Sequence, residues 1–241
     1  MTRIIAVDWS GAQGEQRSHK RIAVAEWAES APSLKLSCGW SREQVVGHVI
    51  RRAHADPQLV VGFDFAFSFP EWFAKILGPD IATVWEAARA SGESWLSQAP
   101  FWSLKRPRAI AGQPAFRATD RAGGVGSPKS IFQNVGNGQV GRGSVRGMKY
   151  LADLREAGFS IWPFDPARLP MVVEIYPTAC YPNGNRRDIA LLRTQLSAAG
   201  LEPDTGTDAT LARVGGCARR GLRPDAHART PRLLRPASGI L

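Results

Sequence analysis

Alternation of apolar and polar residues predicts three strands at the start of the chain. The alternating segments are residues 3–8, 20–27 (KRIAVAEW) and 33–38 (SLKLSC), and the connections between them are turn-like. Short connections favour antiparallel pairing of the strands that they join. The chain is therefore expected to open with three antiparallel strands.

A helix and a fourth strand are predicted next. Ser41 precedes apolar positions at helical spacing, and Gln44 follows three residues later, which is the capping-box pattern of a helix N-terminus. The apolar run LVVGF then predicts a buried strand that ends at Asp64. An insertion at about residues 66–145 follows. Its first part has helical spacing, whereas residues 112–147 are rich in Gly, Ser, Asn and Gln, which favours long loops.

Two helices and two extended segments are predicted after the insertion. Residues 144–158 have helical spacing and end at a glycine, residues 159–164 form a short extended segment, and residues 171–176 (MVVEIY) form a strand. Residues 186–200 predict a last helix, which has one apolar face and again ends at a glycine. Residues 1–205 are thus expected to form one α/β domain.

The composition changes in residues 206–241, which are dominated by Arg, Ala, Gly and Pro. The formal net charge of the chain is +10, and residues 211–241 contribute +6 through seven arginines and one aspartate. Two interpretations of this basic tail remain open. It is either a disordered arm that contacts phosphates or the product of a GC-rich gene read out of frame.

The sequence carries no sign of export or of a membrane span. Its first apolar run is four residues long, too short for a secretory signal, and no run approaches the roughly 18 apolar residues of a transmembrane helix. The three cysteines lack the spacing of a zinc site and are odd in number. We therefore expect a cytoplasmic protein without membrane contact, and the oligomeric state stays open.

Three acidic residues interrupt or end apolar runs. Asp8 follows Ile4–Val7, Asp64 follows the fourth strand, and Glu174 lies within MVVEIY. An ionised carboxylate among apolar neighbours loses solvation unless a cation or hydrogen-bond donors face it. Each acid alone is compatible with a turn or cap residue, but three in the same setting predict a shared cation site.

Five motifs resemble the DUF429 family of predicted RNase H-like nucleases. They are IIAVDWSGA, VVGFDFAFSFP, SIFQNVGNGQVGRGSVRGMKYL, IWPFD and VVEIYPTA, in the expected order from residue 4 to about residue 180. The resemblance implies an RNase H-like α/β fold, with a mixed five-stranded sheet, its first three strands antiparallel, flanked by helices. In that layout the first and fourth strands are neighbours, so Asp8 and Asp64 approach each other and Glu174 joins them.

The resemblance also implies a function. It predicts a metal-dependent nuclease or phosphodiesterase, in which Asp8, Asp64 and Glu174 bind Mg²⁺ or Mn²⁺ and hydrolyse phosphodiester bonds of nucleic acid, DNA or RNA. Nucleases of this type add an acid on the last helix, and the nearest match here is Asp208. Because Asp208 lies in the basic tail, an out-of-frame tail would leave the catalytic site incomplete.

Other polar residues are candidate contacts for the substrate. A small-residue turn follows Asp8, a glycine-rich segment with two arginines precedes a helix, and FWSLKRPRAI combines aromatic and basic residues. Such features suit backbone approach to phosphates and stacking of single strands, although loops and core aromatics explain them as well. The candidate substrate-binding residues are Ser10, Gly11, Lys105, Arg106, Arg142 and Arg146.

Two other functions remain open. The segment VDWSGAQG also resembles the phosphate turn of actin and sugar kinases, which would make the chain an ATP-dependent phosphotransferase. A non-enzymatic nucleic-acid-binding protein would keep the acids without a complete site. Titration with Mg²⁺, Mn²⁺ and ATP separates these functions.

Overall fold

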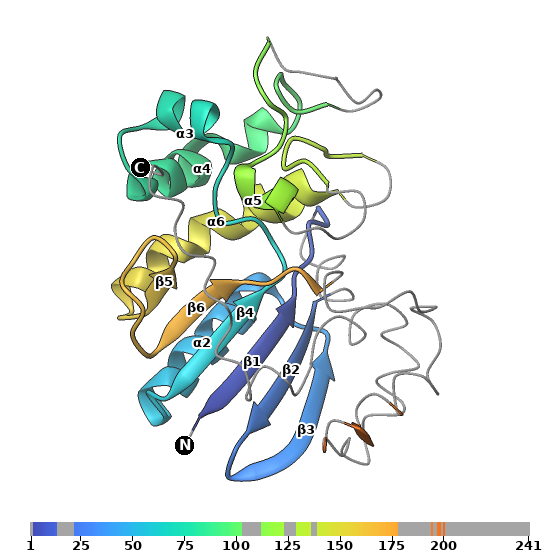
Figure 1. The fold of residues 1–241 in the computed structure, drawn as a ribbon, viewed down its shortest axis with the longest axis vertical. Helices are drawn as coiled ribbons and strands as arrows, with labels where there is room; N and C mark the ends of the chain where they lie inside the picture. Colours follow the sequence, from blue (N-terminus) through green and yellow to red (C-terminus); the bar gives the residue numbers. More distant parts are fainter. Residues whose placement is uncertain are drawn as a thin grey trace.

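One mixed sheet of six strands forms the framework of this α/β protein (Figure 1). The computed structural model describes residues 2–13, 22–102, 112–122, 129–135 and 139–177, together with residues 194, 197, 198 and 200. The strands are β1 (Arg3–Asp8), β2 (Ala23–Ala28), β3 (Ala31–Cys38), β4 (Leu59–Phe63), β5 (Ser160–Trp162) and β6 (Met171–Glu174). Their order across the sheet is β3-β2-β1-β4-β6-β5.

The pairing of the strands agrees with the predicted opening of the fold. β1 is antiparallel to β2, and β2 is antiparallel to β3. β1 is parallel to β4, β4 is parallel to β6, and β6 is parallel to β5. The prediction that the first and fourth strands are neighbours is therefore confirmed.

The prediction of five strands is wrong, because β5 adds a sixth at the edge of the sheet. Ser160–Trp162 was expected to be extended, but three residues are too short for alternation to indicate pairing. Its place depends on tertiary contacts. Ile161 is fully buried, and its backbone amide donates to the Asp165 carboxylate at 2.9 Å.

Five helices accompany the sheet in the part of the chain that the structure describes. They are α2 (Arg42–Ala55), α3 (Glu71–Leu77), α4 (Ile81–Trp95), α5 (Ala118–Ala122) and α6 (Val140–Glu156). The capping box of α2 is confirmed: the Gln44 amide donates to Ser41 Oγ at 3.1 Å, and the Ser41 amide donates to Gln44 Oε1 at 2.8 Å. α6 ends before Gly158, whose φ of 94° suits glycine, as predicted.

The glycine-rich end of the insertion is helical, and α6 begins at Val140, before residue 144 where the predicted helix starts, so the expected loop ends earlier than predicted. Gly141, Gly143 and Gly147 all lie within α6. A methyl group at Gly141 would lie 2.5 Å from the Ile131 carbonyl oxygen, and one at Gly147 would lie 2.6 Å from the Phe65 ring. The glycines therefore allow close packing of this helix against its neighbours.

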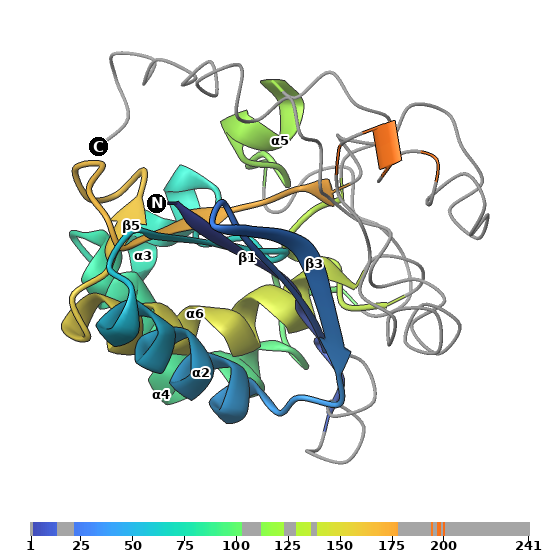
Figure 2. The ribbon, with the colours of Figure 1, turned by 90° about the horizontal axis from the view of Figure 1, so that it is seen from below.

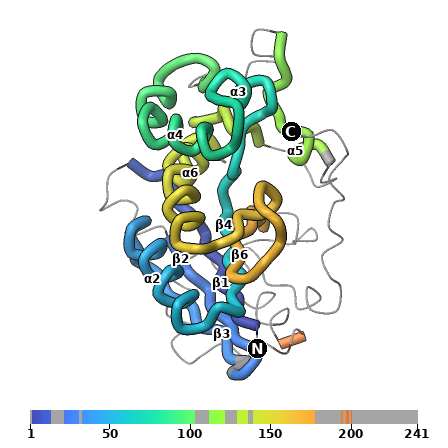
Figure 3. Tube along the Cα trace, turned by 90° about the vertical axis from the view of Figure 1, so that its left-hand side faces the viewer, coloured from blue at the N-terminus to red at the C-terminus, as the bar shows by residue number. Residues whose placement is uncertain are grey.

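The main core lies between the sheet and helices on one of its sides. α2, α4 and α6 all lie on this side (Figures 2 and 3). Ile5, Val61 and Val172, from three neighbouring strands, are fully buried there. The expected helix at 186–200, apart from residues 194, 197, 198 and 200, and the basic tail lie outside the described residues.

Candidate functional site

Asp8 and Asp64 are neighbours at the ends of two parallel strands. Val7 of β1 lies opposite Phe63 of β4, and the Asp64 amide continues this pairing by donating to the Val7 carbonyl oxygen at 3.1 Å. Residues in register on adjacent strands share a face of the sheet and lie about 4.8 Å apart. The register thus brings two of the three predicted acids side by side, and both are half-buried.

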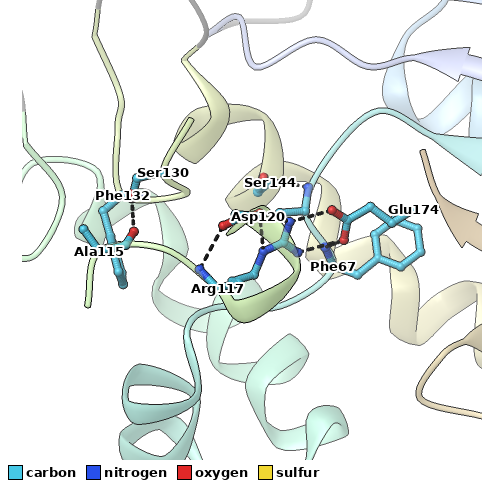
Figure 4. Close-up of polar contacts among 9 residues, drawn as sticks. Phe67, Ala115, Arg117, Asp120, Ser130, Phe132, Ser144 and Glu174 are labelled. Carbon is cyan, nitrogen blue, oxygen red and sulfur yellow. Dashed lines mark hydrogen bonds and ion pairs between the residues drawn. The ribbon is translucent and has the colours of Figure 1, made fainter. Parts of the chain in front are cut away.

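Glu174 does not join this pair. It lies opposite Phe63, one position before Asp64 in register, so side-chain alternation places it on the other face of the sheet. Its carboxylate accepts two hydrogen bonds from Arg117, Nη1 to Oε2 at 2.8 Å and Nη2 to Oε1 at 2.6 Å (Figure 4). Among the described residues, no group of three or more His, Cys, Asp or Glu side chains could hold a metal ion. The expected three-acid cluster is therefore not formed there.

Arg117 joins Glu174 to the start of α5. The Arg117 guanidinium also donates to Asp120 Oδ1, from Nη2 at 2.7 Å and from Nε at 3.1 Å, while the Arg117 amide donates to Asp120 Oδ2 at 2.9 Å. Burial alone would lower the pKa of Arg117, but the carboxylates of Glu174 and Asp120 outweigh it and raise the pKa. The group is thus a permanently charged link between the insertion and β6.

The backbone after Asp64 is held by two side chains from distant parts of the chain. The Phe67 amide donates to Glu174 Oε2 at 3.0 Å, and the Ala66 amide donates to Ser144 Oγ at 3.0 Å. The Phe67 carbonyl oxygen in turn accepts from Trp85 Nε1 at 2.8 Å. The turn that carries Asp64 is therefore fixed on both β6 and the helices.

The loop after Asp8 is held by two arginines. Arg42 donates to the Ser10 carbonyl oxygen from Nε at 3.1 Å and from Nη2 at 2.8 Å, and Nη2 also donates to the Ala12 carbonyl oxygen at 2.6 Å. Arg146 Nη1 donates to the carbonyl oxygen of Gly11 between them. Three consecutive carbonyl groups thus accept hydrogen bonds from guanidinium groups.

Gly11 allows this loop to touch the first turn of α6. A methyl group at Gly11 would lie 2.6 Å from the Gly143 backbone nitrogen and 2.9 Å from the Arg142 carbonyl carbon. Any larger residue would separate the loop from the helix. The contact places Arg142, which is half-buried, beside the loop that follows Asp8.

Arg146 contacts protein groups inside this corner of the molecule. Its side chain is 7% exposed and forms a bidentate ion pair with Glu93 of α4, with Nε–Oε1 at 2.6 Å and Nη2–Oε2 at 2.8 Å. These hydrogen bonds hold the pKa of Glu93 below its ordinary value, although burial raises it. Burial, followed by the charge of Arg146, lowers the pKa of Arg42.

Two residues of the site were not predicted from the sequence, and three predicted residues are not among those that the structure describes. Arg117 and Asp120 were not expected at the site, and their local signal is an oppositely charged pair at i, i+3. Lys105, Arg106 and Asp208, which were predicted as site residues, lie outside the described residues.

Comparisons with known proteins returned no relative. No family model matches the chain, and neither a curated protein nor a solved structure matches it. In the described part, none of the helices is both long and apolar enough to cross a membrane.

Proposed function

We propose that this protein is a metal-dependent phosphodiesterase that cleaves nucleic acid, with Asp8 and Asp64 binding Mg²⁺ or Mn²⁺. The observation that carries the proposal is the register of β1 and β4, which sets two half-buried aspartates side by side at the ends of parallel strands. Two like charges on neighbouring strand ends favour a cation between them.

The oxygen atoms of the two aspartates suit a hard divalent ion. Mg²⁺ prefers oxygen ligands, keeps several waters and is commonly bound through one or two carboxylates together with substrate phosphates. Asp8 and Asp64 fit this requirement, whereas Glu174, engaged by Arg117, does not supply a third ligand. The proposal therefore assigns the ion to two aspartates and gives Glu174 a positioning role.

The arrangement of the strands supports an RNase H-like fold as part of this proposal. Three antiparallel strands lead through α2 to a fourth strand parallel to β1, which is the order that the DUF429 resemblance implies. The sixth strand and the helices of the insertion are additions to that plan.

A bound divalent ion would activate a water molecule and stabilise the leaving oxygen of a phosphodiester. The chain itself supplies orientation. Hydrogen bonds from Arg42 and Arg146 hold the loop after Asp8, and Ser144 and Glu174 hold the turn after Asp64. Arg142 at the first turn of α6 supplies positive charge for a substrate phosphate beside that loop.

Calorimetric titration with Mn²⁺ tests the proposal. Asp64→Asn is expected to weaken Mn²⁺ binding by at least about tenfold and to abolish Mn²⁺-dependent cleavage of single-stranded DNA and RNA. Asp56→Asn is the matched control, since Asp56 precedes the opposite end of β4 and pairs with Arg3 at 3.5 Å. Equal Mn²⁺ binding by the wild type and Asp64→Asn would overturn the assignment, and binding that requires ATP would favour the phosphotransferase.

A further inference from the structure

We infer that Arg146 is a positioning residue that sets the place of Asp8, instead of a contact for the substrate. The inference rests on the proposed function, because it concerns the same metal-binding aspartate. It differs from the expectation from the sequence, in which Arg146 follows a glycine-rich segment and is a candidate contact for a substrate phosphate. The evidence for the positioning role is the set of contacts that the Arg146 guanidinium makes.

The Arg146 guanidinium donates hydrogen bonds to a carboxylate on one side and to a backbone carbonyl group on the other. Nε and Nη2 bind the two oxygens of Glu93, and Nη1 binds the Gly11 carbonyl oxygen. The planar fork of arginine fits a carboxylate on one edge while leaving a donor for a second acceptor. Glu93 therefore orients the guanidinium so that its remaining edge meets the loop.

The segment between Asp8 and Gly11 is short, and its far end is held by hydrogen bonds. Gly11 follows Asp8 by three residues, and the carbonyl groups on either side of Gly11 are held by Arg42. The close approach of Gly11 to Gly143 leaves no room for the loop to move toward α6. Arg146 supplies the hydrogen bond at the centre of this loop, so losing it frees the segment that directly follows Asp8.

The test compares Arg146→Lys with Arg89→Lys. Arg89 is a matched control, because it also joins α4 to α6 by binding a carboxylate, Asp153 Oδ1 at 2.6 Å, and a carbonyl group, that of Lys149 at 2.9 Å. These partners of Arg89, and Glu86, with which it also pairs, lie on α4 and α6. Lysine keeps the charge at both positions but has no planar fork.

The test uses three measurements on the full chain. Amide hydrogen exchange is followed in peptides covering residues 9–13, Mn²⁺ affinity is measured by calorimetry, and kcat and KM are measured with bis(p-nitrophenyl) phosphate and Mn²⁺. Arg146→Lys should exchange faster in this segment by about fivefold or more. Its Mn²⁺ affinity and its kcat should fall by about 10–100-fold with KM unchanged, as is typical when a residue that orients a metal ligand is replaced. Arg89→Lys should change none of these values.

Two results would overturn the inference. One is unchanged exchange in residues 9–13, and the other is a rise in KM with unchanged kcat, which a substrate contact predicts. A wild type that neither binds Mn²⁺ nor hydrolyses the probe overturns the proposed function instead, and exchange alone then decides whether Arg146 holds the loop. If Arg146→Lys does not fold, Glu93→Gln replaces it, because Glu93 is 66% exposed and orients the same guanidinium.

Discussion

Replacing Glu174 by glutamine is expected to destabilise the protein by about 2 kcal/mol. Hydrogen bonds to charged groups contribute about 1.5–3 kcal/mol each, and glutamine keeps one acceptor oxygen but loses the charge and the second acceptor. The Arg117 and Glu174 side chains are 15% and 28% exposed, so solvent screens the pair in part. The loss should therefore stay below the about 3–5 kcal/mol that breaking a fully buried pair costs.

Urea and thermal unfolding in a chelating buffer measure this loss. For a chain of this size, about 2 kcal/mol corresponds to a fall in Tm of about 4–8 °C. Glu71→Gln is the matched control, because Glu71 pairs with Lys75 on the surface of α3, where the two side chains are 57% and 68% exposed. That change should alter the free energy of unfolding by less than about 0.5 kcal/mol.

A metal-ligand role for Glu174 predicts the opposite result. Beside Asp8 and Asp64, a third carboxylate would repel both in the absence of metal, so glutamine would leave the metal-free protein equally or more stable. The rise in Tm on adding Mn²⁺ would then shrink. Both observations together would refute the ion-pair assignment. A double-mutant cycle with Arg117→Gln should instead give a coupling of about 1 kcal/mol or more.

Two further predictions concern packing and pH. Gly147→Ala should destabilise the protein by about 1–3 kcal/mol in urea unfolding, since its methyl group would lie 2.6 Å from the Phe65 ring. The control is Gly47→Ala on α2, where the nearest neighbour is the end of the Arg51 side chain at 3.3 Å, and this change should be neutral or stabilising. Equal effects of the two changes would contradict the packing role of Gly147. Burial raises the pKa of Asp165, but hydrogen bonds from Arg155 and the Ile161 amide outweigh it and lower the pKa. Asp165 thus contributes stability above about pH 4, and this contribution is lost as the pH falls through the lowered pKa. The unfolding free energies of the wild type and Asp165→Asn should therefore converge in acid. A difference between them that stays constant with pH would contradict this prediction.

The predictable parts of the fold are those encoded by local patterns. β1 can be predicted because its side chains alternate between a buried and a half-buried face. The start of α2 can be predicted because Ser41 and Gln44, three residues apart, form a capping box. The start of α6 was misplaced because glycines that pack against Ile131 and Phe65 resemble the glycines of a loop.

The candidate site was predictable only where it depends on strand order. Asp8 and Asp64 meet because β1 and β4 are parallel neighbours, and it was the family resemblance that implied this adjacency. The pairing of Glu174 with Arg117 spans 57 residues and involves a side chain in the insertion. Such a contact leaves no periodic signal in the sequence, so Glu174 looked like a third partner of the aspartates.

The hydrogen bonds that hold the two aspartate-bearing loops have a consequence for folding. Arg146 and Gly11 are 135 residues apart, Glu174 and Phe67 are 107 apart, and Ser144 and Ala66 are 78 apart. Contacts between such distant segments close large loops, and their entropy cost is met only after the sheet and helices have come together. The carboxylate pair should therefore reach its final geometry at the end of folding. Metal affinity would then report whether a preparation is completely folded, more sensitively than its helix content.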